Sequence, residues 1–254
     1  MAITIKSERE IELMAEAGKI LERVHNELEK ALRPGMSTKD IDTLGEEIIR
    51  SYGCIPSFLN YNGYPASICV SVNNEVVHGI PSKKRVIQEG DIVSLDAGVI
   101  YKGYHSDAAR THAVGEVSEE AKKLIQVTKE SFFEGIKFAK AGNHLFDISG
   151  AIGRYAEERG YGVVRDLCGH GIGTALHEAP EIPNYEVGRK GVRLRPGMTL
   201  AIEPMINIGT HEVDWLDDDW TVVTRDGSLS AHYENTILIT EGEPRILSLT
   251  CENE

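Results

Sequence analysis

Two stretches, EGDIVSLD (89–96) and PGMTLAIE (196–203), decide the fold, because they read as one strand that is present twice. Each has a glycine at its second position, continues through apolar and β-branched residues typical of a strand, and ends on a carboxylate. That carboxylate, Asp96 or Glu203, lies six residues after the glycine in both copies, and 107 residues separate the copies (203 − 96 = 107). The sequence therefore predicts an internal duplication.

The same offset relates positions that precede these strands. Gly35, Asp40, Ile41 and Gly53 recur as Gly142, Asp147, Ile148 and Gly160. Each copy then reads as two helices followed by antiparallel strands. We expect an α+β fold in which an antiparallel sheet is covered by helices, with a pseudo-twofold axis between halves at approximately 8–115 and 116–250. The whole chain, 1–254, is expected to form a single domain.

Local patterns place the elements within each half. Apolar residues at helical spacing predict helices over about 7–32, 38–52, 118–140 and 146–160. The first helix begins at a capping box formed by Ser7 and Glu10. Short β-branched runs bounded by turn residues predict strands, and they cover 67–72, 91–100, 198–208 and 231–240.

Composition excludes several classes of protein. With 254 residues, 41% hydrophobic and 26% charged, the chain is neither disordered nor fibrous. Its net charge of −13 opposes binding to nucleic acid or to anionic lipid. No stretch approaches the ~20 apolar residues of a membrane span, and no signal peptide precedes the first helix, so we expect a cytoplasmic protein. The four cysteines form no CxxC pair, which favours free thiols.

Four carboxylates lie on predicted strands at corresponding places in the two halves. Asp96 and Glu203 end the repeated strand, Asp107 follows in GYHSDAAR, and Glu234 lies in AHYENTI. Taken singly, each could be an edge-strand carboxylate that faces solvent. Four that converge on the axis of a duplicated fold could not all ionise without a cation. The arrangement therefore predicts a metal site.

The segment CGHGIG (168–173) supplies a nitrogen ligand, His170, between two glycines that let the backbone approach a site closely. His177 lies seven residues further on. Four carboxylates would balance two divalent ions, and this oxygen-rich set suits manganese, iron, cobalt or magnesium better than structural zinc. Two metals about 3.5–4 Å apart can share and activate a bridging water, which favours hydrolysis.

These residues fall in segments that carry a family resemblance. The segments are SVNNEVVHGIP (71–81), DAGV (96–99), HSDAART (105–111), GHGIGTALHEAP (169–180), PGMTLAIEPM (196–205) and SAHYENT (230–236). Over nearly the whole chain they resemble the type I methionine aminopeptidases, enzymes with two divalent metal ions (cobalt, manganese or iron) on the duplicated pita-bread fold. The resemblance implies removal of the initiator methionine from nascent proteins with a small second residue, by a monomer near the ribosome exit.

The resemblance also implies roles for individual residues. It assigns the metal ligands as Asp96, Asp107, His170, Glu203 and Glu234. It places His78 and His177 beside the metals, where they contact the peptide groups of the substrate and stabilise the tetrahedral intermediate. A bridging hydroxide would attack the first peptide carbonyl while Glu203 relays its proton. The residues that the resemblance implies for the methionine pocket are Phe58, Tyr61, Tyr64, Cys69, Leu176, Met205 and Trp220.

Two features of the sequence indicate which type of methionine aminopeptidase it resembles, and two other classes of protein remain open. The chain starts without a cysteine-rich extension, and only 26 residues lie between His177 and Glu203, so we expect the minimal bacterial form rather than a type II enzyme. The alternatives are a proline-specific dimetal peptidase of the same fold, which would carry a larger N-terminal domain, and a non-catalytic peptide-binding member. His105 and His232 lie two residues from predicted ligands on the same strand face, as further candidates for contact with the site.

Overall fold

The structure is a computed structural model that describes residues 3–249. Its helices are α1 (Glu8–Ala31), α2 (Thr38–Ser51), α3 (Glu119–Ile136) and α4 (Leu145–Glu157), with a short 3-10 turn at Tyr61–Gly63. Its strands are β1 (Ile55–Pro56), β2 (Ile68–Val72), β3 (Glu75–Val77), β4 (Ile92–Tyr101), β5 (Tyr104–Ala113), β6 (Gly162–Val163), β7 (Gly169–Gly171), β8 (Glu178–Ile182), β9 (Thr199–Ile202), β10 (Met205–Asn207), β11 (Val213–Trp215), β12 (Val222–Thr224), β13 (Ser230–His232), β14 (Glu234–Leu238) and β15 (Arg245–Ile246).

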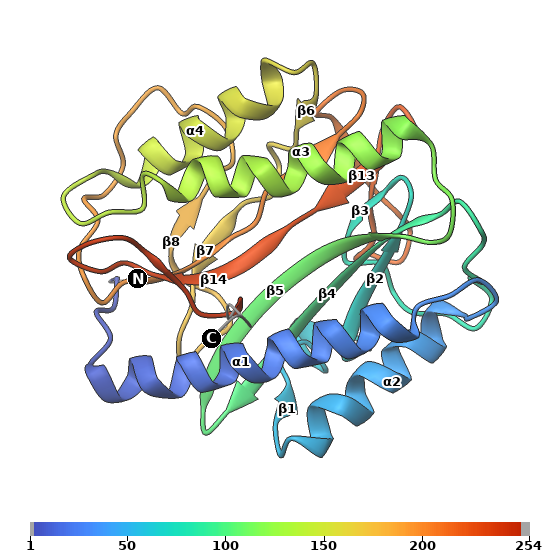
Figure 1. Cartoon of the computed structure of the whole chain (residues 1–254), viewed down its shortest axis with the longest axis horizontal. Helices are drawn as coiled ribbons and strands as arrows, with labels where there is room; N and C mark the ends of the chain where they lie inside the picture. Colours follow the sequence, from blue (N-terminus) through green and yellow to red (C-terminus); the bar gives the residue numbers. More distant parts are fainter. Residues whose placement is uncertain (1–2, 250–254) are drawn as a thin grey trace.

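A nine-stranded antiparallel sheet forms the centre of the molecule. Its strands run in the order β1-β4-β5-β14-β9-β7-β8, with β2 beside β4 and β15 beside β14. Strands of the first half therefore meet strands of the second half where β5 pairs with β14. Figure 1 shows α1 and α3 crossing in front of the sheet, one over each half, with α2 and α4 beside them. This arrangement is the duplicated α+β fold that the sequence predicts.

The repeated positions have local physical reasons. Asp40 and Asp147 occupy the third position of α2 and α4, where each carboxylate accepts a hydrogen bond from the N-cap backbone. Gly90 and Gly197 precede β4 and β9 with φ angles of 92° and 86°. A residue with a side chain rarely adopts this left-handed conformation, so both turns require glycine. The repeat thus preserves the helix starts and strand entries of each half.

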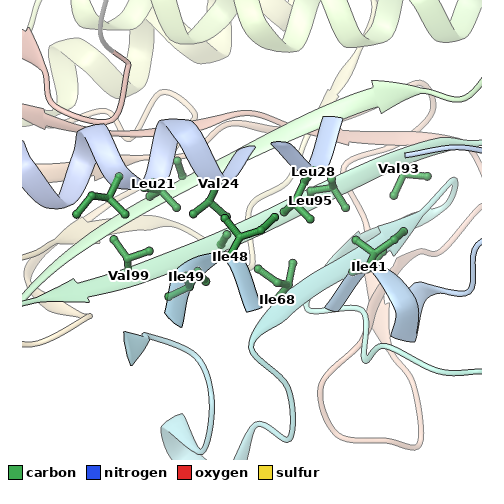
Figure 2. Packing of buried hydrophobic residues seen from close by; sticks show 14 of the residues in the cluster. Leu21, Val24, Leu28, Ile41, Ile48, Ile49, Ile68, Val93, Leu95 and Val99 are labelled. Atoms are coloured by element: carbon green, nitrogen blue, oxygen red, sulfur yellow. The ribbon is translucent and has the colours of Figure 1, made fainter. Parts of the chain in front are cut away.

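Each pair of helices covers its own hydrophobic core. Figure 2 shows Leu21 and Val24 of α1 packed with residues of β4 and α2. On β4, Val93, Leu95 and Val99 belong to this core, because alternate residues of a strand face the same side. Asp96 lies between them and therefore faces away from the helices. Asp107 of β5 and Glu234 of β14 likewise adjoin core residues, Ala108 and Tyr233, and so face away from the helices. Glu203 directly follows the core residue Ile202 at the end of β9.

The second half departs from the sequence prediction at two breaks. The single strand expected over 198–208 ends at Ile202, and β10 begins at Met205 in a different sheet. Pro204 lies between them and has no N–H to continue a ladder. The strand expected over 231–240 is likewise divided at Tyr233, whose N–H donates to the Pro204 carbonyl at 3.2 Å. The two breaks therefore face each other.

None of the helices within residues 3–249 has the length and apolar character needed to cross a membrane.

Candidate metal centre

The four predicted acids meet where the two halves join. Asp96 of β4 and Glu234 of β14 both lie opposite Ala109 of β5. Asp107 lies two residues before Ala109, and Glu203 follows the last residue of β9. Asp96, Asp107 and Glu234 are 9%, 4% and 2% exposed. Antiparallel pairing thus gathers acids from distant parts of the sequence into one buried cluster.

Among residues 3–249, no lysine or arginine forms a salt bridge with any of these four acids, whose close charged partners are the histidines His170 and His232. Oxygens of Asp96, Asp107 and Glu234 are buried without a hydrogen-bond partner. Burial raises the pKa of Asp107 to about 7. Burial, and then the neighbouring acids, raise the pKa of Asp96, Glu203 and Glu234 well above their usual values. Divalent cations would relieve both the missing contacts and the mutual repulsion, so these residues fit a metal site.

His170 presents a ring nitrogen to the acids. Its Nδ1 lies 2.8 Å from the Gly171 carbonyl, so Nδ1 carries the proton and Nε2 keeps a lone pair. That Nε2 lies 4.0 Å from Asp107 Oδ2 and 3.6 Å from Glu203 Oε1. Burial lowers the pKa of His170 to about 3, which keeps the ring neutral. Ligand atoms of Asp107, His170 and Glu234 lie within 4.8 Å of one another, as a shared ion requires.

Close packing explains the glycines beside His170. A Cβ on Gly169 would lie 2.4 Å from the Ala201 carbonyl oxygen, and one on Gly171 would lie 2.2 Å from that of Ala179. Neither position can accept a side chain without movement of a neighbouring strand. The glycines therefore let β7 sit close enough to β9 and β8 to bring His170 to the cluster.

Two more histidines stand at the edge of the acid cluster. The His177 ring lies 4.2 Å from the ring of His170, and its Nδ1 is hydrogen-bonded to the Tyr61 hydroxyl at 2.7 Å. His78 has a φ of 59°, unusual for a residue with a side chain. Burial lowers the pKa of His78 to about 4 and also lowers that of His177. Both rings are therefore neutral at pH 7 and can act as hydrogen-bond partners.

All fourteen residues predicted for the site line one cavity of about 300 Å³. Its polar end is formed by the acids and the three histidines. Its apolar residues include Tyr64, whose hydroxyl donates to the Gly79 carbonyl at 3.0 Å. The Trp220 ring packs edge-on against Tyr64, with the ring centres 5.1 Å apart, and the main-chain N–H of Trp220 donates to Asp218 Oδ1 at 2.9 Å. The individual roles of these residues stay predictions.

The cavity includes residues that the sequence did not single out. They are Asn62, Val77, Asp166, Leu167 and Cys168. Asn62 and Val77 directly adjoin the predicted residues Tyr61 and His78, and Cys168 lies two residues before His170, so nearness in sequence is the signal that could have found them. His105 does not line the cavity and instead bonds Ser57 Oγ at 3.0 Å. His232 has both ring nitrogens buried without partners, and its Nε2 lies 3.8 Å from Glu203 Oε2.

Comparisons with known proteins agree with this geometry. The model of metallopeptidase family M24 matches residues 12–241. The chain is 58% identical to a methionine aminopeptidase from Clostridium acetobutylicum over 98% of this chain and 100% of the relative. It is 52% identical to methionine aminopeptidase 1 of Bacillus subtilis, with 94% and 96% covered. The crystal structure of a methionine aminopeptidase from Thermotoga maritima superposes with a TM-score of 0.96 at 48% identity, covering 98% of this chain and 100% of that one. The chain therefore belongs to metallopeptidase family M24 and, within it, to the methionine aminopeptidases.

Proposed function

We propose that this metallopeptidase removes the initiator methionine from new proteins whose second residue is small, using two divalent ions. The observation that carries the proposal is that one cavity joins an apolar end to a cluster of buried, uncompensated acids. The residues that would hold the ions are Asp96, Asp107, His170, Glu203 and Glu234. When bound, cobalt, manganese or iron would supply Lewis acidity and lower the pKa of a water molecule.

The chain's own residues divide the remaining work. Glu203 lies at the polar end, where its carboxylate can take a proton from the attacking water and pass it to the leaving amine. His177 and His78 are neutral and can hydrogen-bond the first peptide group as charge develops on its oxygen. The Tyr61 hydroxyl fixes the orientation of the His177 ring through its hydrogen bond. These residues thus position the scissile bond between the two ends of the cavity.

The apolar end sets the choice of the first residue. The methionine side chain is apolar and polarisable, and it would lie against Tyr64, Cys69 and Trp220. The other residues proposed for the methionine pocket are Phe58, Tyr61, Leu176 and Met205. The cavity of about 300 Å³ is at the small end of the range for ligand sites, which favours substrates with a small second residue. The free α-amine of the substrate would bind at the acid cluster. Because only the first residue of a chain has a free α-amine, the enzyme would cleave only the first peptide bond.

The setting of the enzyme follows from this substrate. We propose a single catalytic domain, 1–254, with repeat halves at approximately 8–115 and 116–250, acting as a monomer in the cytoplasm. Its net charge of −13 argues against direct binding to nucleic acid. Near the ribosome exit the enzyme would therefore bind the nascent peptide itself rather than RNA.

A peptide series tests the function. With manganese or cobalt present, kcat/KM should be highest for Met-Ala-Ser, lower for Leu-Ala-Ser, and very low for Met-Lys-Ser. Cleavage of Ala-Pro peptides in preference to Met-Ala-Ser would instead identify a proline-specific peptidase. Binding without any cleavage would identify a non-catalytic member. Equal cleavage of the three peptides would mean that the aromatic residues form no selective methionine pocket.

A further inference from the structure

Main-chain pairing is short where the two halves meet. β5 and β14 carry Asp107 and Glu234, but the only residue pairs between these strands are Glu234 with Ala109 and Asn235 with Ala108. Continuing the same register would place Thr236 opposite Asp107. In a regular antiparallel ladder, two such facing residues exchange hydrogen bonds through their main chains. Here the main chain of Asp107 makes its bonds differently.

The Thr236 side chain takes the place of the missing ladder bonds. The Asp107 N–H donates to Thr236 Oγ1 at 2.9 Å, and the same hydroxyl donates to the Asp107 carbonyl at 2.9 Å. Thr236 is fully buried, and its own N–H donates to Ser248 Oγ at 3.0 Å. One hydroxyl thus holds both main-chain polar groups of a proposed metal ligand.

A second threonine repeats the arrangement four residues along β5. The His232 N–H donates to Thr111 Oγ1 at 2.9 Å, and that hydroxyl donates to the His232 carbonyl at 2.9 Å. Because the single hydroxyl proton of Thr111 is used there, Ser94 Oγ must be the donor in its 2.8 Å contact with Thr111 Oγ1. The Thr236 hydroxyl comes from the second half, whereas the Thr111 hydroxyl comes from the first. The two contacts therefore fix the junction from both sides.

A half-buried arginine, Arg110, completes the junction between the two threonines. Arg110 donates through its guanidinium to the Glu234 carbonyl and to Asn235 Oδ1, the latter at 2.6 Å. Its guanidinium carbon also lies 4.5 Å from the centre of the Tyr233 ring. Across the junction itself, two ladder pairs are therefore supplemented by the side chains of Thr236, Thr111 and Arg110, which makes the separation of Asp107 and Glu234 sensitive to single substitutions.

We propose that Thr236 and Thr111 are positioning residues that set the separation of Asp107 and Glu234 for metal binding. This inference rests on the proposed metal centre. Neither threonine lines the cavity; each contacts a main chain that carries a proposed ligand or lies two residues from one. Residues that orient metal ligands in this way commonly change metal affinity when they are replaced.

Three variants separate positioning from general stability. Thr236→Val keeps the branched shape and removes the hydroxyl, whereas Thr236→Ser keeps the hydroxyl. Thr128→Val is the matched control, because Thr128 is also buried and its hydroxyl donates to the Leu124 carbonyl at 2.8 Å within α3, which contributes no predicted site residue. Thr111→Val provides a second test at the other threonine. Each variant is measured for Tm of the metal-free protein and for Mn²⁺ affinity by titration calorimetry.

We expect Thr236→Val to weaken Mn²⁺ binding by about 10- to 100-fold, the range seen when partners of metal ligands are removed. Thr236→Ser should keep most of the Mn²⁺ affinity of the wild type. Thr128→Val should lower Tm and leave the Mn²⁺ affinity unchanged. If Thr236→Val does not fold, the same comparison is made with Thr111→Val. Folded valine variants that bind Mn²⁺ as the wild type does would overturn the positioning role while leaving the metal centre intact. A wild type that binds no Mn²⁺ would overturn the metal centre and this inference with it.

Discussion

The first half of the molecule places its acids on a long regular hairpin, whereas the second half places its acids at the ends of short, interrupted strands. β4 and β5 pair continuously from Ile92 opposite Ala113 to Tyr101 opposite Tyr104. Glu203 instead follows the end of β9, and Glu234 begins β14 directly after the break at Tyr233. The regular hairpin carries aspartates, and the interrupted strands carry the longer glutamates. The same site is thus built from a half with continuous strand pairing and from a half with interrupted strands.

The largest expected effect comes from removing one charge in each half. We expect Asp96→Asn and Glu203→Gln each to abolish turnover of Met-Ala-Ser and to lower the number of bound metal ions. The fold should persist, because a neutral amide replaces a buried acid of nearly equal shape. Turnover, metal content and circular dichroism are measured on the same samples. If one of the two variants kept bound metal and near-normal activity, the halves would not contribute equally and the ligand set would be wrong.

Substitution of His177, a histidine of the second half, should lower activity less than the loss of a metal ligand does. His177→Ala is expected to slow kcat on the order of 10²-fold, the scale for loss of one transition-state donor. Metal content should not change, because His177 contacts His170 and Tyr61 rather than the acids. Tyr61→Phe keeps the ring and removes the hydroxyl, so it should lower kcat by less. Loss of metal from His177→Ala would make His177 a ligand instead of a group that contacts the substrate.

The features that could be predicted from the sequence lie mainly in the first half, on the β4–β5 hairpin. Alternation of Val93, Leu95 and Val99 with Asp96 could be recognised because a strand has a period of two. The breaks at Pro204 and Tyr233 were missed, since apolar runs of 198–208 and 231–240 look continuous in sequence. The contacts of Thr111 and Thr236 could not be predicted. They join residues 121 and 129 positions apart, and their geometry depends on the final register between the halves.

The smallest expected effect concerns the stability of the metal-free protein. Burial raises the pKa of Asp107 to about 7, above its value in the unfolded chain, so folding favours the protonated acid. Stability should therefore increase as pH falls from 8.5 through 7 to about 6.5, with most of the gain below pH 7.5, because at higher pH the acid is ionised in both states. The gain should be about 2 °C in Tm, since each kcal/mol is worth about 2–4 °C in a chain of this size. Below about pH 6.5 the trend should reverse, because buried His170 and His232 have lowered pKa values and resist protonation.

Calorimetry of metal-free wild type, Asp107→Asn and Glu234→Gln between pH 8.5 and 6.5 checks this expectation. The two variants remove one acid from each half and should flatten the rise in Tm. A wild-type Tm that is constant over this range, or that falls as pH is lowered from 8.5 to 7, would contradict this expectation. It would mean that the negative charges of the acids are already balanced in the metal-free protein.

The most direct test is a titration of metal-free protein with Mn²⁺ in which bound ions and cleavage of Met-Ala-Ser are measured in the same samples. We expect no cleavage before metal is added, activity that rises with the first bound ions, and saturation at two ions per chain. Cleavage at an unchanged rate in the presence of a chelator, or a folded protein that binds no Mn²⁺ at its acid cluster, would contradict the claim that the two halves meet to form a metal-dependent site.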